Sequence, residues 1–113
     1  MAKSERLYLG SMFDAAREAR QLIAGMSRQQ FDQNRPLQLA LVHLIQVIGE
    51  AARHVSPLTQ QANSSIPWRL IIGMRNRIVH DYLNIDNDIL WTTVTTDLDA
   101  LITELQKLIP ANP

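Results

Sequence analysis

The stretch that decides the fold lies in the middle of the chain, where residues 37–55 read LQLALVHLIQVIGEAARHV. Apolar residues recur there at steps of three and four, and further apolar residues widen the stripe. That period is typical of an amphipathic helix, and the width of the stripe predicts a central one. Pro36 suits its first turn because proline has no N–H group to leave unpaired there. Gly49 interrupts the pattern and predicts a close crossing by another helix.

Three more segments with helical periodicity flank this one, at about residues 5–26, 67–82 and 86–108. Asp86 is a candidate N-cap for the last of them, and Ser27 opens a capping-box sequence for a short helical turn. No segment alternates with period two over a useful length. The sequence therefore predicts an all-α, antiparallel bundle of four main helices plus one or two short helices.

Composition bounds the class of protein. The chain has 113 residues, 11 Lys and Arg, 11 Asp and Glu, and no Cys, which predicts a single domain over residues 1–113 and excludes thiolate chemistry, Cys-zinc sites and disulfides. Residues 1–10 lack the apolar core of an export signal. No apolar run approaches the roughly 20 residues that a bilayer requires. We therefore expect a cytoplasmic protein that does not insert into membranes.

The zero net charge is a cancellation of two unlike regions. Residues 1–80 carry ten Lys and Arg against five Asp and Glu, whereas residues 81–113 carry one against six. A protein that binds nucleic acid over its whole surface is excluded, but a local basic cleft around Arg75 and Arg77 is not. The acidic last helix is expected to face outward or to offer a surface to a basic partner.

The densest cluster of reactive groups comprises Arg75, Asn76, Arg77, His80 and Tyr82. On one continuous helix Asn76 shares a face with His80, so it is expected to orient the imidazole, whereas Arg75 lies about 140° away. A symmetric dimer would then bring the Arg and His of two copies into one cleft. Arg with His suits phosphodiester cleavage, because a guanidinium grips phosphate and an imidazole transfers protons. The alternative is a solvated helix end with capping and packing roles.

The remaining polar residues indicate no metal or cofactor. Glu50, a carboxylate in an otherwise apolar helix, is expected to pair with Arg75 or Arg77, either structurally or to position the arginine. His43 and His54 do not have metal-binding spacing, and packing is the expected role for them. With few carboxylates near the cluster, metal-independent RNA cleavage is more natural than a two-metal nuclease.

Residues 68–82, WRLIIGMRNRIVHDY, resemble the signature of HepT-like toxins of the HEPN superfamily. That motif is Arg, four residues, His, any residue, Tyr, usually with a polar residue directly after the Arg. Arg75, Asn76, His80 and Tyr82 fill these places. The segments VIGEAA on the central helix and IPW before the third helix, together with the start of the last helix, extend the resemblance to most of the chain.

The resemblance implies a ribonuclease toxin of a type II-like toxin–antitoxin system, acting on RNA, tRNA included, as a helical homodimer. Arg75 and His80 would be its catalytic pair, with Asn76, Arg77 and Glu50 in support. A minimal nucleotidyltransferase antitoxin would transfer AMP to Tyr82, where the added phosphate repels RNA. Two alternatives remain. One is a non-catalytic nucleotide- or RNA-binding partner subunit of the nucleotidyltransferase, and the other is a purely structural bundle.

Overall fold

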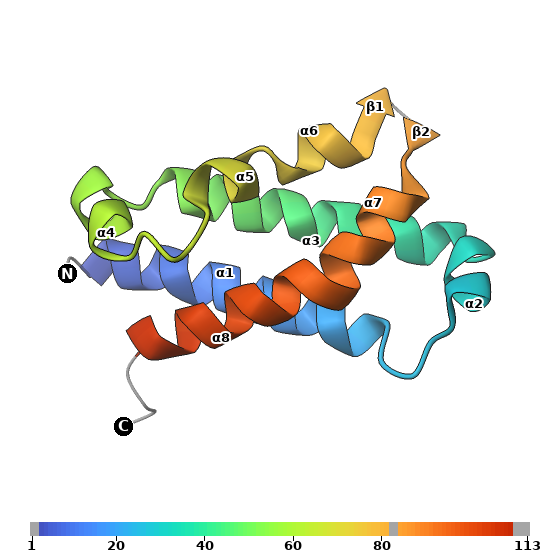
Figure 1. Cartoon of the computed structure of the whole chain (residues 1–113), viewed down its shortest axis with the longest axis horizontal. Helices are drawn as coiled ribbons and strands as arrows, with labels where there is room; N and C mark the ends of the chain where they lie inside the picture. Colours follow the sequence, from blue (N-terminus) through green and yellow to red (C-terminus); the bar gives the residue numbers. More distant parts are fainter. Residues whose placement is uncertain (1–2, 82–83, 110–113) are drawn as a thin grey trace.

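The computed structural model describes residues 3–81 and 84–109 and shows an antiparallel helical bundle (Figure 1). Helices α1 (Lys3–Leu22) and α3 (Arg35–Arg53) pack side by side along their lengths and run in opposite directions. The remaining helical segments run back and forth beside them, so the predicted all-α bundle is confirmed. Within the described ranges, none of the helices combines the length and apolar character that crossing a membrane requires.

Helix α3 forms the centre of the core, as its sequence predicts. Four of its apolar side chains are completely inaccessible to solvent at 0% exposure: Leu41, Ile45, Ile48 and Ala52. Asn34 begins the helix by accepting a hydrogen bond from the Leu37 amide at 3.1 Å, and Pro36 occupies the first turn as expected. These caps and the buried stripe fix α3 as the element against which the other helices are placed.

Gly49 marks the predicted close crossing, and the partner is α5 (Trp68–Ile72). A Cβ atom at position 49 would lie 3.3 Å from the carbonyl oxygens of both Ile71 and Ile72. That spacing is tighter than ordinary van der Waals contact, and both neighbours are backbone atoms that cannot turn away. The missing side chain therefore lets the backbone of α5 rest directly on α3.

The third predicted helix is not continuous, which corrects the expectation of one helix over residues 67–82. It breaks at Gly73 into α5 and α6 (Met74–Ile78), although the Gly73 amide still donates to the Arg69 carbonyl at 3.2 Å. After α6 the backbone becomes extended at Val79. Glycine lowers the helix propensity at the break, and the β-branched pair Ile78 and Val79 favours extended backbone after it.

A short antiparallel ribbon follows, made of β1 (Val79–Asp81) and β2 (Asn84–Ile85). Val79 pairs with Ile85, and an irregularity in register separates this pair from that of Asp81 with Asn84. The Asp86 amide closes the reversal by donating to the Ile78 carbonyl at 2.7 Å. The sequence pattern did not indicate this ribbon, because so few residues form it.

The last helical segment is continuous but contains a π-helical turn. Helix α7 (Asn87–Thr92) is followed by η1 (Thr93–Asp97) and α8 (Leu98–Leu108). In η1 the Leu98 amide bonds to the Thr93 carbonyl, so the Val94 carbonyl is released from the helix ladder. The Arg20 guanidinium on α1 donates to that carbonyl at 3.0 Å and replaces the hydrogen bond that the carbonyl lost in the π-turn.

Two short helices close the ends of the bundle, α2 (Arg28–Asp32) and α4 (Pro57–Ala62). The predicted capping box of α2 is present, with Ser27 and Gln30 each accepting from the other's amide. At α4, the Glu5 carboxylate accepts from the Ser56 amide and from the Thr59 hydroxyl. These hydrogen bonds connect the start of α1 to the start of α4. They also lower the pKa of Glu5, because they favour the charged carboxylate.

Candidate active site

Arg75 and Asn76 lie on α6 with both side chains exposed, at the upper edge of the bundle in Figure 1. Arg75 Nη1 donates to Asn76 Oδ1 at 3.4 Å. Asn76 therefore contacts the arginine, and among the described residues it forms no hydrogen bond with His80. The expectation that Asn76 orients the imidazole is wrong, because it assumed that the helix continues to His80.

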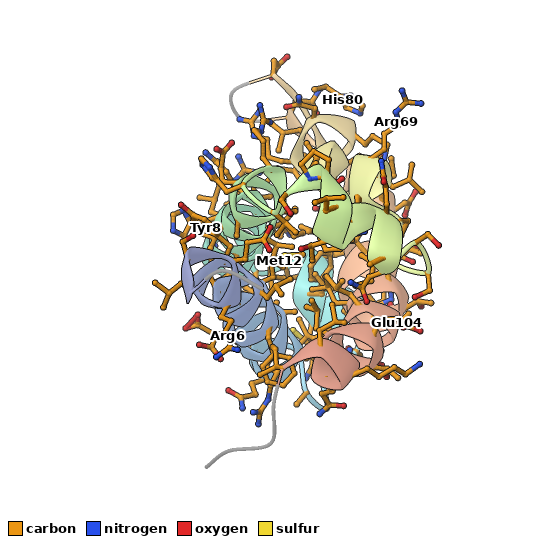
Figure 2. The ribbon with its side chains drawn as sticks, turned by 90° about the vertical axis from the view of Figure 1, so that its left-hand side faces the viewer. Arg6, Tyr8, Met12, Arg69, His80 and Glu104 are labelled. Carbon is orange, nitrogen blue, oxygen red and sulfur yellow. The ribbon has the colours of Figure 1, made fainter. Side chains whose placement is uncertain are left out.

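His80 lies on β1 and is exposed, projecting from the same edge as α5 and its Arg69 in the end-on view of Figure 2. Its Nε2 atom is 3.7 Å from Oδ2 of Asp86, and the two side chains are 55% and 31% exposed. Sequence reasoning assigned Asp86 only as the N-cap of α7, a role that the structure confirms. The contact with His80 depends on the ribbon, which the periodicity did not indicate.

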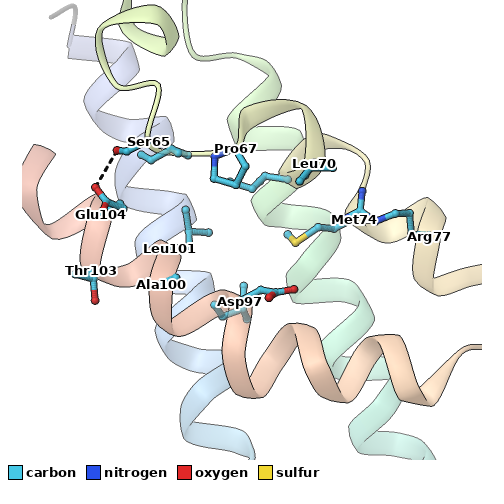
Figure 3. A pocket seen from close by; sticks show the side chains of 13 residues that line it. Ser65, Pro67, Leu70, Met74, Arg77, Asp97, Ala100, Leu101, Thr103 and Glu104 are labelled. Carbon is cyan, nitrogen blue, oxygen red and sulfur yellow. Dashed lines mark hydrogen bonds between the residues drawn. The ribbon is translucent and has the colours of Figure 1, made fainter.

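Arg77 points away from Arg75, because residues two apart lie about 200° apart around a helix. A Cβ atom at Gly73 would lie 3.4 Å from Arg77 Nη1, so the side chain folds back over the break in the helix. It lines a cavity of about 480 Å³ between α5–α6 and η1–α8, with Leu70, Met74, Asp97 and other residues (Figure 3). The two arginines thus serve different surfaces, and a single cleft formed by both within one chain is not observed.

Glu50 is exposed, and its carboxylate lies 3.9 Å from Arg53 Nη2, one turn along the same helix. In the described part of the chain it forms no ion pair with Arg75 or Arg77, which corrects the expected pairing across the bundle. The i,i+3 neighbour reaches the carboxylate first, and both groups remain in water. Tyr82, the expected modification site, lies outside the described residues.

The charges of the chain are paired unevenly. Arg20 Nε lies 2.6 Å from Asp99 Oδ1, and Arg28 Nη2 lies 2.6 Å from Asp88 Oδ1. Hydrogen bonds to Asp32 and Asp88 raise the pKa of Arg28 above its usual value. Asp88 and Asp99 of the acidic last segment are exposed. Both bind arginines of the same chain, so they are not free to bind a basic partner.

The arginines of α5 and α6 have no such partners. Arg69 and Arg77 form no ion pair with any other described residue, and Arg75 contacts only the neutral Asn76. Three unneutralised guanidinium groups therefore extend along the segment that leads to His80. Such groups attract phosphate, the anion that an arginine binds in bidentate fashion.

The other two histidines lie on or directly after α3. His43 is exposed on α3, and His54 stacks on Tyr8 with ring centroids 4.9 Å apart. Over residues 3–81 and 84–109, no three His, Asp or Glu side chains come close enough together to hold a metal ion.

Fold and site together define a helical bundle that presents Arg and His, groups able to bind phosphate and to transfer protons, on one exposed edge. The model of the family described as "Ribonuclease HepT-like" matches residues 12–108. The chain belongs to this HepT-like ribonuclease family, which confirms the resemblance found in the sequence and its enzyme class. No solved structure gives a significant match.

Three curated relatives match over nearly their whole length. The chain is 27% identical to "Probable ribonuclease HepT" of Thermococcus cleftensis, over 96% of this chain and 98% of the relative. It is 25% identical to "Putative RNase TTE0752" of Caldanaerobacter subterraneus subsp. tengcongensis, over 95% and 96%. It is 24% identical to "Putative RNase MJ1380" of Methanocaldococcus jannaschii, over 89% and 93%.

Proposed function

We propose that this chain is a metal-independent endoribonuclease in which Arg75 binds the scissile phosphate and His80 transfers protons. The observation that carries the proposal is that both side chains are exposed on consecutive elements, α6 and β1, of a chain that belongs to a ribonuclease family. The guanidinium stabilises negative charge that develops on the phosphate oxygens. The imidazole takes the proton of the RNA 2′-hydroxyl, or gives one to the leaving oxygen.

Substrate binding is assigned to the unneutralised arginines Arg69, Arg75 and Arg77. Because Arg75 and Arg77 point to different sides of α6, we infer that RNA contacts more than one face of this segment. A homodimer supplies such a wrapped surface, since a two-fold axis beside α6 places two copies of the Arg and His pair around one cleft. Asn76 supports Arg75, to which it is hydrogen-bonded at 3.4 Å.

We further propose that the protein is the toxin of a toxin–antitoxin pair, with tRNA among its substrates. Its antitoxin is a minimal nucleotidyltransferase that transfers AMP to Tyr82. Tyr82 is two residues from His80 in the chain, so the added phosphate carries negative charge to the segment that attracts RNA. Modification would therefore block binding electrostatically and leave the helical core untouched.

The test is to incubate purified wild type, His80→Ala and His43→Ala with total RNA in EDTA. We expect wild type and His43→Ala to cleave RNA equally, and His80→Ala to lose at least about 100-fold in rate. His43 is the matched control because it is an exposed histidine on α3 and lies outside the motif in sequence. Equal cleavage by His80→Ala would contradict the proposal, and RNA binding without cleavage by wild type would favour the non-catalytic binding subunit.

A further inference from the structure

The ribbon that follows α6 brings Asp86 to the histidine of the motif. Val79 pairs antiparallel with Ile85, so His80 follows this pair on β1 and Asp86 follows it at the end of β2, and the two residues are diagonal neighbours across the ribbon. The hydrogen bond from the Asp86 amide to the Ile78 carbonyl, at 2.7 Å, holds the two segments in this register. The approach of Asp86 to His80 is therefore fixed by backbone hydrogen bonds as well as by side-chain rotamers.

The two oxygens of the Asp86 carboxylate have separate partners. Oδ1 accepts the Ile89 amide at 3.0 Å as the N-cap of α7, whereas Oδ2 faces His80 Nε2 at 3.7 Å. Because the cap fixes the rotation of the carboxylate, Oδ2 stays directed at the imidazole. At 3.7 Å the two atoms are within ion-pair range and beyond hydrogen-bond length, so Oδ2 acts on the ring through its charge and favours a proton on the nearer nitrogen, Nε2.

Asp81 is the other carboxylate beside His80 in the chain, and it is exposed. It forms no hydrogen bond or ion pair with His80, although it is adjacent in sequence, because neighbouring side chains on a strand point to opposite faces. The ribbon therefore brings Asp86, six residues away in the chain, to His80, and not the adjacent Asp81. Asp81 supplies a matched control for the charge of Asp86.

We propose that Asp86 is a positioning residue for His80, an inference that rests on the proposed function. Asp86 holds the imidazole through Nε2 and leaves Nδ1 free to exchange a proton with the RNA. When Nδ1 takes the proton of the 2′-hydroxyl, the ring becomes an imidazolium whose positive charge lies beside the carboxylate. This arrangement favours the tautomer with hydrogen on Nε2 and stabilises the protonated ring, as an orienting carboxylate does for a catalytic histidine.

The first arm of the test examines the contact without using activity. Long-range ¹H–¹⁵N NMR spectra report the tautomer of each ring, and His80→Ala assigns the His80 signals among the three histidines of the chain. We expect wild type to show the Nε2–H tautomer at His80 and Asp86→Asn to shift those signals toward a tautomer mixture. His43 and His54 should not move. Unchanged His80 signals in Asp86→Asn would overturn the proposal.

The second arm separates positioning from helix capping. Asn and Ser both serve as N-caps, so Asp86→Asn and Asp86→Ser should retain the melting temperature of wild type. Because the pair is partly exposed, each should lower kcat by about three- to fivefold with little change in KM. Asp81→Asn removes the same charge from the same edge and should leave kcat unchanged.

Equal kcat values in wild type, Asp86→Asn and Asp86→Ser would overturn the positioning role, as would an equal fall in Asp81→Asn. A fall in kcat that follows the melting temperature would assign Asp86 to capping alone, which also contradicts the proposal. If wild type cleaves no RNA, the proposed function fails, and the NMR arm still decides whether Asp86 orients His80.

Discussion

The arginines of α1 and α2 and those of α5 and α6 differ in what they contact. Arg20 and Arg28 each bind a carboxylate of the last helical segment at 2.6 Å. Arg69, Arg75 and Arg77 have no carboxylate partner within the described residues. The charges of the first group are neutralised by carboxylates of the same chain, whereas the second group can bind an external anion. The comparison teaches that paired arginines stabilise this bundle, whereas the arginines of α5 and α6 keep their charge beside His80.

The largest expected effect on this comparison is the loss of activity in Arg75→Ala. The side chain is exposed and, among the described residues, its one polar partner is Asn76, so the melting temperature should stay within about 1 °C of wild type. Its removal takes away the group that stabilises charge on the phosphate, and we expect a fall of at least about 100-fold in RNA cleavage. Arg53→Ala is the control, since Arg53 is exposed but pairs with Glu50. An active Arg75→Ala would break the division between the two groups.

A smaller effect, on stability alone, is expected for Arg20→Ala. This change leaves the Val94 carbonyl of the π-turn without its donor and removes the ion pair with Asp99. We expect a loss of about 1–3 kcal/mol in the free energy of unfolding, measured by urea denaturation, with RNA cleavage unchanged at temperatures where the protein is folded. Arg17→Ala, which removes a cation–π contact with Phe13 and no ion pair with a described residue, should cost less. Equal losses in the two variants would contradict the structural role of Arg20.

The smallest effect is expected for Arg69→Ala, which tests whether the unneutralised arginines act as one surface. One phosphate contact fewer should weaken RNA binding by about two- to fivefold and reduce the slope of log K against log salt by about 1. Arg6→Ala is the control, because Arg6 is exposed on the side of the bundle away from Arg69 (Figure 2). Equal salt slopes for wild type and Arg69→Ala, in binding measured by fluorescence anisotropy, would limit the surface to α6.

Much of the fold was predictable because it depends on local signals. The buried stripe of α3, the caps formed by Asn34, Ser27 and Asp86, and the close approach at Gly49 each follow from residues within a few positions of one another. Asn34 itself was not singled out, although Asn before a proline-initiated helix is a usable capping signal. The bundle follows because each amphipathic face requires a partner.

The sequence names candidate residues for the site, but it does not predict their geometry. The motif names Arg75 and His80, yet the helix break at Gly73 and the strand at Val79 depend on how α5 meets α3 and on pairing with Ile85. A periodicity of three and four residues continues across such breaks, so it does not reveal them. The Glu50 partner was also mispredicted, because a pattern that places two helices side by side does not fix the distance between their charged ends.

Gly49, a residue of the core, affects the position of the helix that carries Arg75. Its contact with the last carbonyls of α5 lies directly before the break at Gly73, so the position of α6 follows from how closely α5 rests on α3. A single methyl group at residue 49 would push the end of α5 away from α3 and tilt the segment that bears Arg75. It would contact none of the residues proposed to act on RNA. If Arg75 acts as proposed, its alignment is adjustable from a buried position on another helix, and mutational screens for altered activity have a target there that inspection of the surface would not select.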